Sequence, residues 1–143
     1  MSPHLSICIV SSDQATITVL RFMFMAMGFA SPLCFNDTQE AWGYIGANTP
    51  DLILDDCRDD PVSARQLMER VRANQKTASV PIIALTASKS ETCWREALKA
   101  GATEFLFNPF NIKHLHGAVE TALFSQKVKN GMRDSTGRLR IPA

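Results

Sequence analysis

The sequence predicts an α/β fold built on a five-stranded parallel sheet with helices on both faces. Three observations support this prediction. Short apolar runs alternate along the chain with segments whose apolar residues recur at helical spacing, which is typical of strand–helix–strand units. Residues that commonly cap helices follow several of these runs. The run Leu52–Leu54 is apolar throughout, as expected for a central strand that is covered on both faces.

Five segments have the composition of strands. Each is apolar or rich in β-branched residues, and polar or turn-forming residues bound it. Helical segments lie between successive strands, which favours parallel pairing through right-handed crossovers. The predicted strands are residues 5–10, 32–35, 51–56, 80–86 and 103–107.

Five helices are predicted to alternate with these strands. The first follows cap-type residues at 11–13 and ends before Gly28. The fourth follows a capping box formed by Ser88 and Glu91 and ends at Gly101. The predicted helices are residues 14–27, 36–48, 63–74, 88–101 and 112–124.

Length and charge indicate one globular domain followed by a polar tail. The chain has 143 residues and 45% hydrophobic residues, which is ordinary for one folded domain. Residues 125–143 carry five basic residues and one acidic residue, whereas residues 1–124 carry ten basic and thirteen acidic residues. A weakly acidic body offers no footprint for nucleic acid. We interpret the basic tail as a solvated linker.

The sequence predicts a cytoplasmic location without membrane contact. The amino terminus lacks the charged region and cleavage site of a signal peptide. The longest apolar stretch, residues 22–30, is too short to span a bilayer. The four cysteines show no CxxC pairing, so reduced thiols are favoured over a zinc site or disulfides.

Polar residues follow four of the predicted strands. The carboxyl ends of parallel strands meet at one edge, where doubly wound folds place their ligands. We therefore expect Ser11–Asp13, Asp56, Thr86 and Asn108 to converge there. A carboxylate at the position of Asp56 suits three roles, which are a nucleophile, a metal ligand and a charged surface residue.

Four short motifs together resemble a response-regulator receiver domain, the module that accepts phosphate in two-component signalling. They are PDLILDD at 50–56, PIIALTA at 81–87, AGA at 100–102 and FLFNPF at 105–110. The resemblance covers roughly residues 4–124. It implies a flavodoxin-like sheet with strand order 2-1-3-4-5, and a receiver domain at 1–124 followed by the tail at 125–143.

The resemblance also implies a set of site residues. The family has a phosphoacceptor aspartate, an acidic pair that binds magnesium, a hydroxyl residue, a small residue beside the phosphate, a lysine and a switch aromatic. The corresponding residues in this chain are Asp56 as acceptor, Ser11 and Ser12 at the acidic pair, Thr86 as hydroxyl, Ala87 as small residue, Asn108 at the lysine and Phe105 as aromatic.

These residues predict a degenerate site. Magnesium prefers carboxylate oxygens, and one carboxylate with two hydroxyls should hold it poorly. Asn108 also lacks the positive charge that would pair with phosphate. We expect no bound metal and no cofactor, with a weak alternative in which Asp13 and Asp56 hold magnesium.

Arg58 lies two residues after Asp56 and carries a positive charge near the site. One hypothesis is that its guanidinium pairs with Asp56 and replaces the metal electrostatically, a pair that gains roughly 4 kcal/mol before desolvation. The alternative is a solvated loop arginine that faces Asp55, Asp59 and Asp60. The sequence leaves both open.

The first helix is apolar on most sides, which suggests a surface for a partner. Helical spacing assigns Val19, Leu20 and Phe24 to the buried face and leaves Ile17, Phe22 and Met25 pointing outward. Exposed apolar patches of this kind usually mark an interface. The resemblance implies a histidine kinase, a phosphotransfer protein or another signalling protein as partner, and a second copy of the chain is an alternative.

The predicted function is an atypical receiver that acts mainly by protein contact, with magnesium-dependent phosphorylation weak or absent. The alternative is a working phosphoacceptor that a histidine kinase modifies on Asp56. An enzyme on this fold is disfavoured because the chain has neither G-x-G-x-x-G nor a P-loop.

Overall fold

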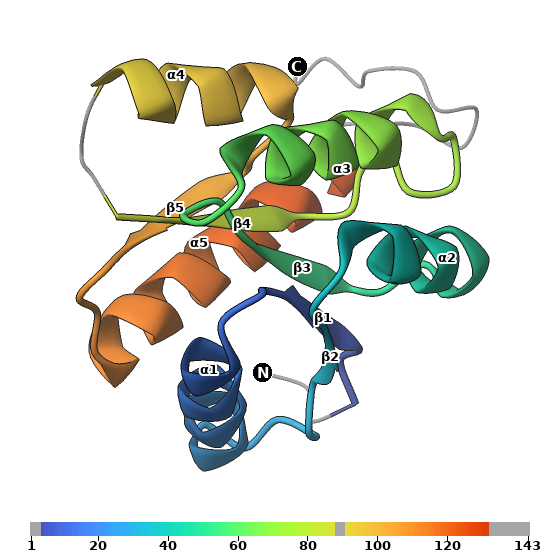
Figure 1. Ribbon diagram of the computed structural model, residues 1–143. Helices are drawn as coiled ribbons and strands as arrows, with labels where there is room; N and C mark the ends of the chain where they lie inside the picture. Colours follow the sequence, from blue (N-terminus) through green and yellow to red (C-terminus); the bar gives the residue numbers. More distant parts are fainter. Residues whose placement is uncertain (1–3, 88–90, 132–143) are drawn as a thin grey trace.

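Five parallel strands form one sheet in the order β2-β1-β3-β4-β5, so the predicted fold class and strand order are confirmed (Figure 1). The computed structural model describes residues 4–87 and 91–131. The change in winding direction at β1 and β3 opens a crevice at the carboxyl edge of the sheet. The strands are β1 (Ile7–Val10), β2 (Leu33–Phe35), β3 (Leu52–Asp56), β4 (Ile82–Thr86) and β5 (Glu104–Phe107).

Helices cover both faces of the sheet. Figure 1 shows α1 and α5 on one face and α2, α3 and α4 on the other. The two hydrophobic clusters follow the same division, since each combines strand residues with residues of the helices on its own side. The helices are α1 (Gln14–Ala26), α2 (Thr38–Asn48), α3 (Pro61–Ala73), α4 (Glu91–Ala100) and α5 (Ile112–Gly131).

Strand β3 contributes to both cores because its side chains alternate between the faces. Leu52 and Leu54 pack with the α1 and α5 side, and Ile53 packs with the α2, α3 and α4 side. The same alternation separates the two acidic residues at the end of the strand. Asp55 shares its face with Ile53, and Asp56 shares its face with Leu54.

Aspartates cap three helices that begin near the crevice. Asp13, Asp37 and Asp60 are the N-cap residues of α1, α2 and α3, and each side chain accepts a hydrogen bond from a backbone N–H of the first turn. Helix α3 begins at Pro61, two residues before the predicted start at Ser63. Proline suits the first helical position because the backbone N–H it lacks has no helical partner there.

Helix α5 continues to Gly131, so the predicted end of this helix at residue 124 is wrong. Residues 126–130 include neither proline nor glycine, so they can continue a helix even though the apolar period is lost there. Residues 132–143 of the predicted tail, and Ser88 of the predicted capping box, lie outside the described residues.

The rotation of α1 differs from the prediction. Ile17 was expected to face outward but is 3% exposed, and Val19 was expected to be buried but is 46% exposed. The buried residues Ile17, Leu20 and Phe24 follow the spacing of three and four that defines one helix face. Because α1 is apolar on most sides, its sequence allowed two rotations, and packing on the sheet selected one.

Arg72 of α3 ties together two loops at the end of the sheet opposite the crevice. Its Nη1 donates to the carbonyl oxygen of Val80 at 2.6 Å, and its Nη2 and Nε donate to that of Gly101 at 2.7 and 3.0 Å.

Two further features concern the whole described chain. All four cysteines are free thiols. Within residues 4–87 and 91–131, no helix is long and apolar enough to cross a bilayer.

Candidate functional site at the carboxyl edge of the sheet

Asp56 is the last residue of β3, and its carboxylate accepts four hydrogen bonds. Oδ1 accepts from the Nε of Arg58 at 2.9 Å and from the backbone N–H of Arg58 at 3.1 Å. Oδ2 accepts from the Nη2 of Arg58 at 2.8 Å and from the hydroxyl of Ser11 at 2.7 Å. The Asp56 side chain is only 3% exposed. Both oxygens are therefore occupied by donors from this chain.

Arg58 lies on the loop after β3 and turns back onto the strand end. Besides the two bonds from its guanidinium to Asp56, its Nη2 donates to the Oγ1 of Thr16 on α1 at 2.6 Å. The same nitrogen lies 3.7 Å from Oδ2 of Asp13, the cap of α1. Of the two arrangements that the sequence leaves open for Arg58, the structure shows the one in which its guanidinium pairs with Asp56. The planar fork of the guanidinium matches the two oxygens of a carboxylate.

These contacts change the titration of both partners. Burial alone would raise the pKa of Asp56, but the hydrogen bonds from Arg58 and Ser11 hold it below its usual range. The hydrogen bond to Asp56 raises the pKa of Arg58 further above neutrality. The carboxylate and the guanidinium are thus a fully ionised pair at neutral pH.

The three residues after β1 have different positions. Ser11 is 3% exposed and bonds Asp56. Ser12 is exposed, and its hydroxyl donates to Oδ2 of Asp59 at 2.8 Å. Asp13 caps α1, and its Oδ2 accepts from Thr16 at 2.7 Å. Only Ser11 of this group therefore contacts Asp56 directly, and Asp13 approaches it through Arg58.

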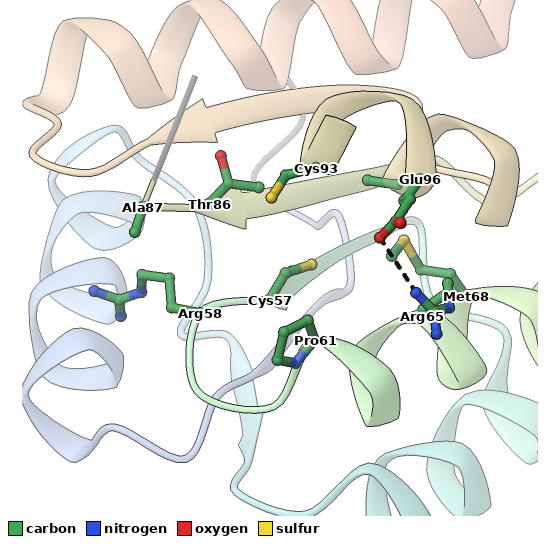
Figure 2. Close-up of a pocket in the computed structure, with 10 residues that line it drawn as sticks. Cys57, Arg58, Pro61, Arg65, Met68, Thr86, Ala87, Cys93 and Glu96 are labelled. Carbon is green, nitrogen blue, oxygen red and sulfur yellow. Dashed lines mark hydrogen bonds and ion pairs between the residues drawn. The ribbon is translucent and has the colours of Figure 1, made fainter. Parts of the chain in front are cut away.

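Thr86 is the last residue of β4 and Ala87 follows it. Both line a cavity of about 180 Å³ together with Cys57 and Arg58. Figure 2 shows Arg58 beneath Ala87 at one end of this cavity, with Arg65 and Glu96 at the other end. Burial raises the pKa of the Cys57 thiol, and the charges of Asp55 and Asp56 raise it further. Cys57 therefore stays a thiol at neutral pH, which makes it a poor nucleophile.

The two predicted site residues on or after β5 make their contacts with β4, with α4 and within β5. Asn108 is exposed, and its backbone N–H donates to the carbonyl oxygen of Thr86 at 2.9 Å. Phe105 is half-buried against α4, with its ring 5.6 Å from that of Trp94 in an edge-on arrangement. Its ring also stacks on that of Phe107.

The sequence reasoning missed two residues of this region, Thr16 and Asp55. Thr16 is not among the predicted site residues, and the structure makes its hydroxyl a partner of Arg58. Asp55 was treated only as a neighbouring charge, yet it is fully buried. Strand alternation was the signal available for Asp55, since it places residues 55 and 56 on opposite faces of the sheet.

The arrangement provides a neutralised carboxylate rather than a preformed metal centre. Within the described part of the chain, no group of three histidine, cysteine, aspartate or glutamate side chains is placed to hold a metal ion. The positive charge next to Asp56 comes instead from Arg58, with Thr16 and Asp13 holding the guanidinium from the other side.

Comparison with known proteins identifies the family. The family model described as the response regulator receiver domain matches residues 7–120, and the chain belongs to this family. The phosphate regulon transcriptional regulatory protein PhoB of Pseudomonas aeruginosa is 29% identical over 115 residues, which are 80% of this chain and 50% of that protein. The PhoB protein of Rhizobium meliloti is 30% identical over 117 residues, or 82% and 51%. The chain thus spans about half the length of these relatives.

Solved structures agree with the fold. A putative response regulator from Chloroflexus aurantiacus has a TM-score of 0.78 at 26% identity, covering 84% of this chain and 98% of that one. The Vibrio cholerae chemotaxis protein CheY4 has a TM-score of 0.76 at 21% identity, covering 83% and 98%. The chain is therefore a receiver domain of two-component signalling by family and by fold.

Proposed function

We propose that this receiver domain is atypical and acts mainly through contacts with other proteins, with magnesium-dependent phosphorylation of Asp56 weak or absent. The observation that supports this proposal best is the two-point pair between Arg58 and Asp56. The pair places the positively charged guanidinium of Arg58 on both carboxylate oxygens of Asp56, whereas a phosphoacceptor needs one of these oxygens free to attack phosphorus.

The pair opposes phosphoryl transfer because the attacking oxygen must approach phosphorus in line. Both oxygens of Asp56 already accept hydrogen bonds, and the side chain is almost completely shielded from solvent. Arg58 would have to leave before a phosphodonor reached the carboxylate. Charge-assisted, bidentate hydrogen bonds of this kind are among the strongest in proteins, so the open state is expected to be rare.

The residues around Asp56 also do not suit magnesium, the ion that the family implies. Magnesium is usually bound through one or two carboxylates and retains several waters. At the positions of the family's acidic pair, Ser11 bonds Asp56 and Ser12 bonds Asp59. Arg58 already neutralises the one carboxylate of the set. We therefore infer that the domain holds magnesium at Asp56 poorly.

The position of the family's lysine supports the same proposal. Asn108 is neutral and exposed, and it lines neither of the two cavities that border Asp56 and Arg58. A phosphoryl group on Asp56 would thus lack a lysine partner. The cation within reach is Arg58, and it is held by Asp56, Thr16 and Asp13 before any phosphate arrives.

A surface for partners is available on α1. Phe22 is 74% exposed and Met25 is 53% exposed, and Val19 lies on the same side of the helix. We infer that this apolar face contacts a histidine kinase, a phosphotransfer protein or another signalling protein. A second copy of the chain is the competing occupant, which measurement of the oligomeric state distinguishes.

The second candidate is a working phosphoacceptor that uses Arg58 in place of the metal. The observation in its favour is that Arg58, Thr86 and Ala87 border one cavity (Figure 2). In this reading, the guanidinium moves from the carboxylate to the phosphoryl oxygens, a geometry that suits arginine.

Treatment with acetyl phosphate or beryllofluoride, each with and without magnesium, tests both candidates. Intact mass and amide NMR spectra are the measurements, and Asp56→Asn is the control. We expect no stoichiometric adduct under either condition. A stoichiometric adduct that needs magnesium and is lost in Asp56→Asn would overturn the proposal. An adduct that forms without magnesium and is lost in Arg58→Ala would favour the second candidate.

A further inference from the structure

Two cysteines from different elements line the cavity beside Arg58. Cys57 directly follows β3, and Cys93 lies in the first turn of α4. Both belong to the lining of the cavity of about 180 Å³. Figure 2 shows them facing the same space, Cys93 from α4 and Cys57 from the end of β3. The fold therefore brings together two thiols that are far apart in the sequence.

Helix periodicity fixes the direction of Cys93. It lies four residues before Ala97, which is 6% exposed and packs in the same core cluster as Met68 of α3. Residues four apart lie on one face of a helix, so Cys93 shares the inward face of Ala97. Cys57 packs against this cluster from the strand end, and its Sγ donates weakly to the carbonyl oxygen of Asp55 at 3.6 Å. Both thiols thus lie on the same side of the sheet.

The two thiols differ in access to solvent and in titration. Cys93 is exposed, whereas Cys57 is half-buried. Burial raises the pKa of the Cys57 thiol, and the charges of Asp55 and Asp56 raise it further. Negative charge on Cys93 has the same effect, which places the two sulfur atoms within electrostatic range of each other. An oxidant from solvent therefore meets Cys93 first, while Cys57 remains a protonated thiol beside it.

We propose that Cys93 and Cys57 form a redox pair, in which a hydroperoxide oxidises Cys93 and Cys57 then closes a disulfide across the cavity. In the first step, the Cys93 thiolate attacks hydrogen peroxide. The S–O bond forms, the O–O bond breaks and hydroxide leaves, so Cys93 becomes a sulfenic acid. In the second step, the Cys57 sulfur attacks the Cys93 sulfur. The S–S bond forms, the S–O bond breaks, and the departing hydroxide takes the Cys57 proton as water.

The high pKa of Cys57 is compatible with this second role. Cys57 is a poor first nucleophile because little of it is thiolate, but a thiolate of high pKa is intrinsically more nucleophilic. The step is also intramolecular, which raises the effective concentration of the attacking group. Once Cys93 is a neutral sulfenic acid, its charge no longer opposes ionisation of Cys57. The order of the two steps thus follows from the different surroundings of the two thiols.

A disulfide at this place would connect α4 to the strand that carries Asp56. An S–S bond holds its two Cα atoms within about 7 Å, so it would fix the first turn of α4 against the end of β3. Arg58 and Ala87 line the same cavity and would lie next to the link. Oxidation would therefore act on the surroundings of Asp56, whether or not this residue accepts phosphate.

Intact mass after treatment of the reduced protein with hydrogen peroxide tests the proposal. We expect the loss of two hydrogen atoms, reversed by dithiothreitol, and a linked peptide pair that contains Cys57 and Cys93. The loss should disappear in Cys57→Ser and in Cys93→Ser. Cys34→Ser is the matched control, since Cys34 is also half-buried and lies on β2, and it should oxidise like the wild type. In Cys57→Ser, dimedone should trap a sulfenic acid on Cys93.

Two measurements keep the test independent of the folding of the variants. Alkylation of the wild-type protein with N-ethylmaleimide under native conditions should modify Cys93 first and then prevent the link. The oxidised wild type should unfold several degrees higher than the reduced form, because the link restrains the unfolded chain. Peroxide products that carry sulfinic acid on Cys93 without a link would overturn the proposal. A link to Cys8 or Cys34, or one between two copies on non-reducing electrophoresis, would overturn it as well.

Discussion

The guanidinium of Arg58 holds both carboxylate oxygens of Asp56 at 2.8–2.9 Å, although the two residues are only two positions apart in the chain. The pair combines short sequence separation with deep burial of the carboxylate. It is reinforced from a distant part of the chain, since Thr16 of α1 accepts from the same guanidinium. Contacts from Ser11 and Thr16 thus hold in place a pair formed by two residues close in sequence.

Replacing Arg58 with alanine should destabilise the domain. The change leaves the Asp56 carboxylate nearly buried with only Ser11 and a backbone N–H as donors. Removing one partner of a buried pair costs roughly 3 kcal/mol of the free energy of unfolding. Urea unfolding followed by circular dichroism measures the loss. Arg65→Ala is the matched control, since Arg65 pairs with Glu69 and Glu96 at the surface and should cost less than about 1 kcal/mol. Equal losses in the two variants would contradict the structural role of Arg58.

The stability contributed by Asp56 should depend on pH in the acid range. Its folded-state pKa is lowered by the hydrogen bonds from Arg58 and Ser11, which outweigh the effect of burial. The contribution is therefore fully present above about pH 4, where the carboxyl of the unfolded chain is ionised. It is lost as the pH falls through the lowered folded-state value. The difference in unfolding free energy between the wild type and Asp56→Asn should shrink from neutral pH toward pH 3. A difference that stays constant over this range would show that the carboxylate charge contributes nothing.

Restoring charges at three positions should create a magnesium-dependent phosphate site. The variant Ser11→Asp, Ser12→Asp, Asn108→Lys adds the carboxylates and the cation that phosphoryl transfer uses. Without magnesium it should be less stable than the wild type, because new negative charges stand beside Asp56. Magnesium should recover the stability and allow a beryllofluoride adduct, seen by NMR. Asn108→Lys alone is the control. Suppose that the triple variant folds but magnesium neither stabilises it nor allows an adduct. Residues 11, 12 and 108 are then not the reason that the wild-type domain binds magnesium poorly.

Arg72 should matter more than its neighbour Arg70 on the same helix. Arg72 donates to the carbonyls of Val80 and Gly101, so Arg72→Ala leaves these groups without a charged donor. We expect a loss of about 2–3 kcal/mol in unfolding free energy. Arg70 lies over the ring of Trp42 at 5.2 Å, and Arg70→Ala should cost about 0.5–1 kcal/mol. Chemical denaturation of both variants tests the ranking, and the reverse order would refute it.

The apolar face of α1 should contribute to association and not to folding. Phe22 and Met25 are exposed, so replacing both with serine should leave the unfolding midpoint nearly unchanged. Association with a second copy or with a kinase should weaken, as measured by sedimentation or by titration. Ile17→Ala is the contrasting variant, because Ile17 is buried and its truncation should cost about 2–5 kcal/mol. Undiminished binding in the double variant, both to itself and to partners, would remove α1 as an interface.

The topology and the location of the site were predictable from the sequence. Apolar runs such as Leu52–Leu54 and the alternation of strands with helices require a covered parallel sheet, and such sheets gather strand ends at one edge. Asp56, Thr86 and Ser11 could be assigned to that edge because a strand end is a local property. The rotation of α1 could not be assigned, because Ile17 and Val19 are equally apolar and only the packing of the helix on the sheet selects which one is buried.

The receiver fold, the place of Asp56 at the end of β3 and the residue types around it could all be predicted from the amino-acid sequence. The folded arrangement was needed to see that Arg58 pairs with Asp56 and not with Asp55, Asp59 or Asp60, and that the carboxylate oxygens of Asp55 accept no hydrogen bond. Charge pairing depends on side-chain direction and on hydrogen-bond partners from distant elements, such as the donor Ser11 and the acceptor Thr16. Local sequence patterns encode the backbone path, whereas these contacts exist only after the helices have packed onto the sheet.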